Sequence, residues 1–340
     1  MDLAALNKIA NGMVETGKGI LAADESGGTI KKRFDQINLE STGDARRDYR
    51  EMLFRSEGMQ HISGVILYDE TIWQKAADGT PLVKLIESAG AIPGIKVDEG
   101  TEELAGAKGD LVTKGLDNLS ARLPKYYEAG ARFAKWRAVI DPTGGRPTYA
   151  GLLANTHALA RYANLCQANN IVPIVEPEVL MDGDNDIDAC LDVTQWVLKE
   201  TFQQLYYMNV ALEGIVLKPN MIVPGKKSAK KAGIAEIAEK TIRCLKDCVP
   251  SAVPGIAFLS GGQSDEEATA NLGAMNALGG LPWKLTFSYG RALQQPAIMA
   301  WAGKPENVKR AQAVFTHRAK MNGLAAKGAY KPEMERELAA

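Results

Sequence analysis

The chain has 340 residues, of which 46% are hydrophobic and 24% are charged, and its formal net charge at pH 7 is −1. This balance argues against a nucleic acid or a membrane surface as the main partner. We find no signal-peptide pattern, and no apolar run approaches the roughly 20 residues that a membrane-spanning helix needs. The four cysteines form no CxxC pair, which favours reduced thiols and a cytoplasmic location.

Short apolar runs that end in charged or hydroxyl residues recur along the chain. Each has the length of a strand, and its apolar residues follow one another almost without interruption, as in strands that are buried on both faces. The runs that we predict to be strands are Gly19–Asp24, Ile62–Glu70, Ile92–Lys96, Phe133–Arg137, Val172–Glu178, Gly214–Met221, Gly255–Ser260 and Leu285–Gly290.

Helical patterns lie between these runs. Ser264 and Glu267 have the spacing of a capping box, which predicts a helix start. Thr80-Pro81 predicts another start, with proline in the first turn. The helical stretches that we predict include Met1–Met13, Thr80–Glu87, Thr148–Asn169, Asp186–Met208 and Ser264–Leu278.

Eightfold alternation of strand and helix predicts an α/β fold, a closed (β/α)8 TIM barrel with right-handed crossovers. We predict one catalytic domain over residues 1–328, including an N-terminal helix, followed by a C-terminal tail at 329–340. The tail is mostly charged, and only Met334 and Leu338 are apolar enough to dock. We therefore expect it to be mobile or weakly held.

Lys218 ends an apolar strand pattern and is followed by Pro219, which ends the run. Removing an ammonium from water is costly unless the group is paired or neutral. An amine in such a place is a candidate nucleophile for a carbonyl. The alternative is a lysine whose ammonium reaches solvent at the end of the strand.

Charged residues end the two preceding strands at the same parity. Lys135 and Arg137 are two residues apart, and so are Glu176 and Glu178, so each pair points to one side of its strand. Because the three strands are consecutive, we expect these side chains to converge with Lys218 in the barrel mouth. An ion-pair network that only stabilises the barrel is the alternative. The excess of lysine disfavours it, because leucine would stabilise a strand better.

Two groups of hydroxyl, glycine and cationic residues follow other strands and predict anion sites. Glycines let backbone N–H groups approach an anion, and arginine adds a forked cation. The loops after the last two barrel strands are a common phosphate site in this fold. One group is Ser260, Gly261, Ser288, Gly290 and Arg291, and the other, which we expect across the barrel mouth, is Ser26, Thr29, Arg33 and Lys96. Arg137 is a further cation that we predict to bind a substrate phosphate.

We predict no metal and no cofactor. The three histidines are scattered, so a histidine-rich zinc or iron site is disfavoured. Glu176, Glu178 and Asp24 have the oxygen ligands that magnesium prefers. Against a magnesium site, the lysines that we expect at neighbouring strand ends would repel a cation.

Several segments resemble those of class I fructose-1,6-bisphosphate aldolases in the same order along the chain, over roughly residues 5 to 330. The resemblance implies a (β/α)8 barrel, usually a homotetramer, that cleaves a sugar bisphosphate in glycolysis and gluconeogenesis without a metal. The segments are Ala22–Ser26, Gly94–Asp98, Phe133–Arg137, Val175–Glu178, Leu217–Asn220, Leu259–Gln263 and Phe287–Leu293.

The resemblance also implies roles for individual residues. Lys218 is similar to the lysine that forms a Schiff base with the C2 ketone, and Glu176 to the acid/base of carbinolamine formation and dehydration. Glu178 matches a carboxylate that orients the nucleophile, and Lys135 a cation that assists. Asp24 matches the group that orients the C4 hydroxyl during C3–C4 cleavage. Of the two predicted anion sites, the one containing Arg291 matches the C1-phosphate site, and the one containing Lys96 matches the other phosphate end.

The chain departs from this family at its end. Many members end in a tyrosine on a flexible tail, whereas the last tyrosine here is Tyr330. This leaves open how the enamine is protonated and whether a bisphosphate or a monophosphate such as fructose 1-phosphate is preferred. Other hypotheses are an aldolase for sedoheptulose 1,7-bisphosphate, a metal-dependent barrel enzyme that EDTA inactivates, and a scaffold barrel without catalysis.

Overall fold

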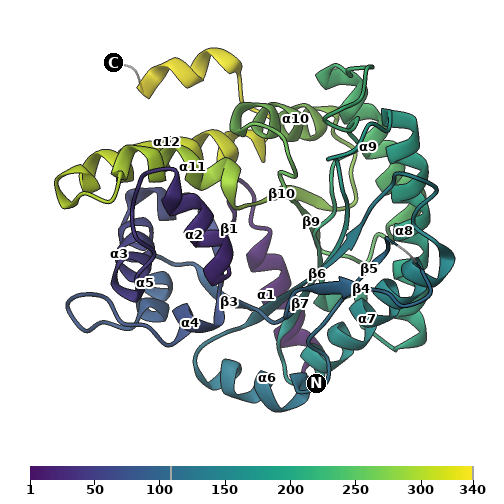
Figure 1. The fold of residues 1–340 in the computed structure, drawn as a ribbon, viewed down its shortest axis with the longest axis horizontal. Coiled ribbons are helices and arrows are strands. Elements are labelled where there is room, and N and C mark those ends of the chain that lie inside the picture. Colours follow the sequence, from purple (N-terminus) through teal and green to yellow (C-terminus); the bar gives the residue numbers. More distant parts are fainter. Residues whose placement is uncertain (108, 339–340) are drawn as a thin grey trace.

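The computed structural model describes residues 1–107 and 109–338. Parallel strands close into an eight-stranded barrel in the order β1-β10-β9-β8-β7-β6-β3-β2, surrounded by helices (Figure 1). This confirms the predicted (β/α)8 barrel. Its strands are β1 (Gly19–Ala23), β2 (Ile62–Leu67), β3 (Ile92–Lys96), β6 (Phe133–Ile140), β7 (Val172–Val179), β8 (Val216–Leu217), β9 (Gly255–Phe258) and β10 (Lys284–Tyr289).

β2 and β8 are the strands that fall furthest short of their predicted lengths. β2 ends at Leu67, and the residues from Asp69 form the short helix α4 (Asp69–Ile72) instead of continuing the strand. β8 contains two residues, although the Lys218 N–H still donates to the Val175 carbonyl at 2.8 Å. Pro219 has no N–H to donate, so the ladder ends there.

The predicted helices are confirmed in place, and most of their starts are too. Ser264 and Glu267 form the reciprocal capping box, and the side chain of Thr148 caps its own helix. The start predicted at Thr80-Pro81 is wrong by one residue, because Pro81 is the capping residue and Thr80 lies in a turn in which its carbonyl accepts from Ala76 N–H. The longer helices are α1 (Leu3–Met13), α2 (Gly27–Asp35), α3 (Gly43–Phe54), α5 (Leu82–Ser88), α6 (Leu119–Glu128), α7 (Tyr149–Ala168), α8 (Ile187–Tyr207), α9 (Ile234–Cys248), α10 (Asp265–Leu278), α11 (Arg291–Trp301) and α12 (Val308–Ala325).

A small antiparallel hairpin, β4 (Thr101–Glu103) and β5 (Leu111–Thr113), was not predicted. β4 is Thr-Glu-Glu and β5 is Leu-Val-Thr, so each is too short to show the apolar pattern that would mark a strand in the sequence. It matters for the site, because Thr101 and Leu111 line the cavity at the barrel mouth.

The interior of the barrel is apolar at its N-terminal end, where α1 packs. A cluster of buried side chains joins Leu6 and Met13 of α1 to Phe133 and Ile174 of the strands. The Phe133 ring packs against Gly94, where an added Cβ would lie 2.3 Å from the ring. This floor leaves the opposite, C-terminal end of the barrel for polar residues. A second, larger apolar cluster lies between the strands and the outer helices.

The C-terminal segment is held by a charged residue. Glu335, in a 3-10 turn over Pro332–Leu338, accepts from Arg318 at 2.5 Å, from Tyr330 at 3.0 Å and lies 3.0 Å from His317 Nε2. Burial alone would raise the pKa of Glu335, but the buried Arg318 guanidinium outweighs it and lowers that pKa. The segment lies at the outer edge of the ring in Figure 1, beyond α12. The expectation that only Met334 and Leu338 could dock the tail overlooked this carboxylate. The domain boundary at residue 328 stays a prediction.

Two further properties bear on the expectations from composition. No helix within the described residues is long and apolar enough to cross a membrane. All four cysteines are free thiols, three of them buried and Cys248 half-buried.

Candidate active site

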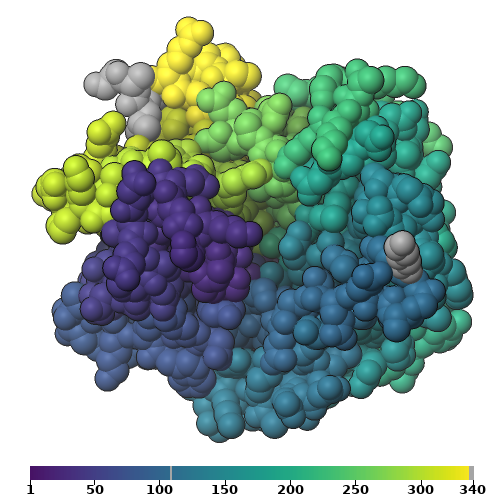
Figure 2. All heavy atoms as spheres, in the orientation of Figure 1, coloured from purple at the N-terminus to yellow at the C-terminus, as the bar shows by residue number. Residues whose placement is uncertain are grey.

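A cavity of about 1020 Å³ opens at the C-terminal ends of the strands. Its mouth is the hollow in Figure 2 between the purple N-terminal segment and the blue and teal segments. The wall includes the predicted residues Asp24, Lys96 and Lys135, together with the hairpin residues Thr101 and Leu111. This is the end of the barrel where this fold carries its chemistry.

Strand parity places the charged residues here. Phe133 of β6 and Ile174 of β7 point into the apolar floor of the barrel. Side chains alternate along a strand, so Lys135 and Glu176, two residues further on, point to the same interior, one layer higher. Lys218 follows Val216 of β8, another floor residue, in the same way. The predicted convergence in the barrel mouth is confirmed.

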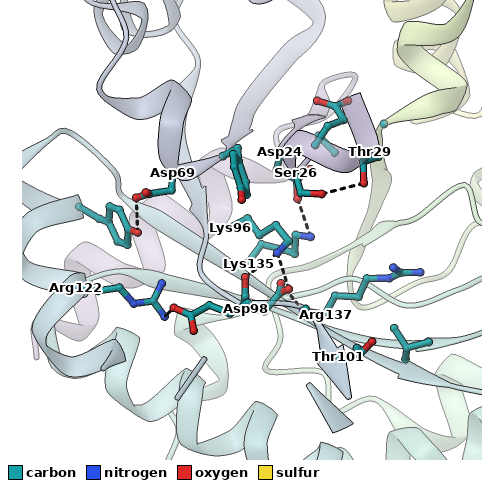
Figure 3. A pocket seen from close by; sticks show the side chains of 18 of the residues that line it. Asp24, Ser26, Thr29, Asp69, Lys96, Asp98, Thr101, Arg122, Lys135 and Arg137 are labelled. Carbon is teal, nitrogen blue, oxygen red and sulfur yellow. Dashed lines mark hydrogen bonds and ion pairs between the residues drawn. The ribbon is translucent and has the colours of Figure 1, made fainter. Parts of the chain in front are cut away.

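Glu176 lies between two ammonium groups. Lys218 Nζ is 3.2 Å from Glu176 Oε1, and Lys135 Nζ is 3.5 Å from Glu176 Oε2. Lys135 Nζ also lies 2.7 Å from Asp24 Oδ2, a contact drawn in Figure 3. The exposed fractions are 4% for Lys218, 4% for Lys135 and 3% for Glu176, so water screens these contacts little.

The charges shift the pKa values of Asp24 and Lys135 strongly. Burial alone would raise the pKa of Asp24, but Lys135, Lys218 and Lys96 outweigh it and lower that pKa to about 2. Burial alone would lower the pKa of Lys135, but Asp24 and Glu176 outweigh it, so that pKa lies above its usual value. Asp24 is therefore a carboxylate and Lys135 an ammonium at neutral pH.

The other predicted charged residues pair within the mouth. Glu178 accepts a hydrogen bond from Arg137 Nε. The carboxylate that contacts Lys218 is Glu176. Lys96 Nζ lies 2.6 Å from Asp98 Oδ1, which Figure 3 shows beside it. Asp98 was not predicted as a site residue. Its spacing of two from Lys96 is the signal that would have placed it on the same side.

The first predicted anion site is assembled around one loop. Arg291 Nη2 donates to the Gly261 carbonyl at 3.1 Å, which joins the start of α11 to the loop after β9. Gly261 has φ +56°, a conformation that glycine adopts without strain. Gly290 is the capping residue of α11, and the buried Ser288 Oγ has no hydrogen-bond partner within the described residues. These groups can receive an anion.

The second predicted anion site is only partly across the mouth. Ser26 Oγ and Thr29 Oγ1 lie 3.1 Å apart at the start of α2, and a Cβ on Gly290 would be 3.4 Å from Arg33 Nη2. Arg33 therefore lies beside the first site, because the barrel closes by pairing β1 with β10. Lys96 is across the mouth, since β3 is opposite β9 in the strand order. The expectation of two separate, facing groups is wrong for Arg33.

The carboxylates of the site contact cations of the protein. Asp24, Glu176 and Glu178 each pair with a lysine or an arginine. Within residues 1–107 and 109–338, no three His, Cys, Asp or Glu side chains are grouped as metal ligands would be. Glu25, which was not predicted as a site residue, lies 2.6 Å from Arg33 Nη1 and also lines the cavity. Its position next to Asp24 after β1 was the available signal.

Known proteins resemble this chain over nearly its whole length. The sequence model of one family, described as glycolytic fructose-bisphosphate aldolase class I, matches residues 5–340. The chain belongs to the class I fructose-bisphosphate aldolase family. The match confirms the family resemblance that was carried by the segments at the strand ends. Members of this family are lyases, and so is this protein.

Relatives of this aldolase match over nearly its whole length. A probable class 1 fructose-bisphosphate aldolase of Xanthomonas campestris is 52% identical over 97% of this chain and 100% of the relative. The cytosolic fructose-bisphosphate aldolase 6 of Arabidopsis thaliana is 56% identical over 93% of this chain and 88% of the relative. The solved structure of the Plasmodium falciparum aldolase, in complex with TRAP and a small-molecule inhibitor, has a TM-score of 0.95 and 49% identity, covering 97% of this chain and 96% of that one.

The lowered pKa of Asp24 predicts a pH-dependent stability. Because the folded pKa is about 2 against an ordinary 3.8, the carboxylate stabilises the fold fully above pH 3.8, and this is lost as the pH falls towards 2. Asp24→Asn should lower the free energy of unfolding by about 2 kcal/mol at pH 7 and roughly half as much at pH 3. Urea unfolding at both pH values measures this, with the exposed Asp184→Asn as control. An equal difference at both pH values would contradict it.

Proposed function

We propose that this aldolase reversibly cleaves fructose 1,6-bisphosphate to dihydroxyacetone phosphate and glyceraldehyde 3-phosphate through a Schiff base on Lys218, without a metal. The observation that carries the proposal is the contact of the buried Lys218 ammonium with Glu176, 3.2 Å away, at the end of a barrel strand. Membership of a glycolytic lyase family supports the same reaction.

Imine formation needs a proton shuttle, and Glu176 is placed for it. Glu176 takes a proton from Lys218, and the free amine then adds to the C2 carbonyl to give a carbinolamine. Glu176 returns the proton to the carbinolamine hydroxyl, which leaves as water. The iminium that forms is positive, and Glu176, a carboxylate again, lies beside it. Lys135, 3.5 Å from Glu176, holds this carboxylate between the two amines.

Cleavage of the C3–C4 bond then uses Asp24. As a carboxylate, Asp24 accepts a hydrogen bond from the C4 hydroxyl and orients it, while Glu176 takes the hydroxyl proton and the electrons of the C3–C4 bond move into the iminium. Glyceraldehyde 3-phosphate leaves, and a neutral enamine remains on Lys218. Protonation of the enamine at C3 and hydrolysis of the imine release dihydroxyacetone phosphate and restore the amine. The 2.7 Å contact with Lys135 fixes Asp24 at the mouth beside this centre.

The two phosphates of the substrate fit the two sides of the mouth. We assign the C1 phosphate to the loops of Ser260, Gly261, Ser288, Gly290 and Arg291. The other phosphate is assigned to Ser26, Thr29, Lys96 and Arg137. The opposite positions of β3 and β9 in the ring support this span. Arg33, beside Gly290, is a cation for the first of these phosphates.

Borohydride trapping tests the covalent step. Reduction in the presence of dihydroxyacetone phosphate should attach the ligand to Lys218, because its strand position and its contact with Glu176 favour imine formation. Peptide mass mapping locates the label, Lys218→Met should abolish it, and EDTA should leave activity unchanged. Lys227→Met, in an exposed loop, is the control. A label at Lys96 or Lys135, or none, would overturn the assignment.

Tyr330 lies away from the proposed chemistry. Its hydroxyl donates to Glu335, and its ring lines a separate cavity with Pro332. Tyr330→Phe should therefore lower aldol cleavage by less than about tenfold, which is below the roughly hundredfold or more that a general acid contributes. Single-turnover cleavage with an oxidant that intercepts the enamine measures this, with the exposed Tyr149→Phe as control. A loss of about a hundredfold, with enamine accumulating, would show that Tyr330 supplies the proton.

We also propose a cytoplasmic homotetramer. The cytosolic plant relatives support the location. Large aromatic side chains on α8 are exposed in the single chain, 74% for Tyr206 and 63% for Tyr207, as a surface that meets another subunit would be. Sedimentation equilibrium should give about four times the 36.6 kDa of one chain, and replacing both tyrosines by serine should lower that mass. A monomeric mass for the unaltered protein would contradict the proposal.

A further inference from the structure

A buried carboxylate in the cavity wall is shared by two arginines. Glu25, 5% exposed, lies 2.6 Å from Arg33 Nη1 and 3.6 Å from Arg50 Nη2. Arg33 is on α2 and reaches the cavity beside Gly290, whereas Arg50 is on α3 and is only 1% exposed. Arg50 Nη2 also donates to the Glu25 carbonyl at 3.1 Å, which ties it to the loop that carries Asp24.

Arg50 contacts two carboxylates, and the shorter contact is the one with Glu25. Its other carboxylate contact, with Glu70, is longer at 3.8 Å, and Glu70 already accepts from Arg46 Nε at 2.8 Å. Two nitrogens of Arg50, Nε and Nη1, are buried without a hydrogen-bond partner within the described residues. Burying a guanidinium with unpaired nitrogens is costly, and an apolar side chain would fill the same space at a lower cost. An electrostatic role therefore accounts for Arg50 better than packing does.

The charges explain what such a residue does. When a carboxylate pairs with only one arginine, it neutralises the charge of that arginine. The arginine then attracts an incoming anion only weakly. Because Arg50 compensates the negative charge of Glu25, the positive charge of Arg33 remains available to an anion in the cavity. We propose that Arg50 is a positioning residue that neutralises Glu25 and thereby makes Arg33 available to the substrate phosphate near Gly290.

This inference rests on the proposed function, in which Arg33 contacts a phosphate. Arg50→Met should raise KM for fructose 1,6-bisphosphate, and the inhibition constant of inorganic phosphate, by about tenfold, the effect of weakening one charge-assisted contact. The kcat should stay close to that of the unaltered protein, because Arg50 touches neither Lys218 nor Glu176. Steady-state kinetics and phosphate inhibition measure these constants.

A double-mutant cycle shows whether Arg50 acts through Arg33. In an Arg33→Ala background, Arg50→Met should have no further effect on KM. Arg50→Met combined with Glu25→Gln should restore KM, because the carboxylate that would neutralise Arg33 is gone. Arg46→Met is the matched control, since it removes the same charge from the same helix but contacts Glu70 and not Glu25.

Several results would overturn the inference. They are an unchanged KM in Arg50→Met, an equal rise in the Arg33→Ala background, an equal rise in Arg46→Met, or no effect of Arg33→Ala itself. If Arg50→Met does not fold, Glu25→Gln alone decides, because KM should then be equal to or below that of the unaltered protein, and a raised KM contradicts the inference. Borohydride labelling of Lys218 in each variant keeps these failures distinct from a failure of the proposed reaction.

Discussion

The site depends on one buried carboxylate, Glu176, held between the ammonium groups of Lys218 and Lys135. Charges that are almost fully removed from water are costly, and replacing them by apolar residues often stabilises a protein. Here each charge is compensated by a neighbour on the next strand, which makes the arrangement possible. It also makes the chemistry possible, because a carboxylate between two amines can pass a proton to either.

The alternation of side chains along the barrel strands brings these compensating charges together. One layer of apolar residues, closed from below by α1, keeps water out, and the next layer carries the charges. Asp24 joins this layer from the far side of the ring through Lys135, so strands that are distant in sequence share one electrostatic unit. The low pKa of Asp24 reports that unit, since three lysines act on it together.

Closure of the ring also organises the anion sites. Pairing of β1 with β10 brings Arg33 from the start of the chain beside Gly290 near its end. Behind Arg33, Glu25 and Arg50 extend the charged layer into the packing between the barrel and α3. An arginine that contacts a ligand is thus supported by one that is buried, and their shared carboxylate links the two.

The eight strands, most helix starts and the positions of Lys218, Lys135, Glu176 and Asp24 at strand ends were predictable from the sequence, because strand length, parity and capping are local patterns. The hairpin of β4 and β5, the docking of Glu335 and the place of Arg33 were not, since such short strands show no apolar pattern and ion pairs join residues far apart in the chain. Local patterns determined which residues face the barrel mouth. Only the closed ring decided which of them meet, because its strand order makes neighbours of the first and last strands.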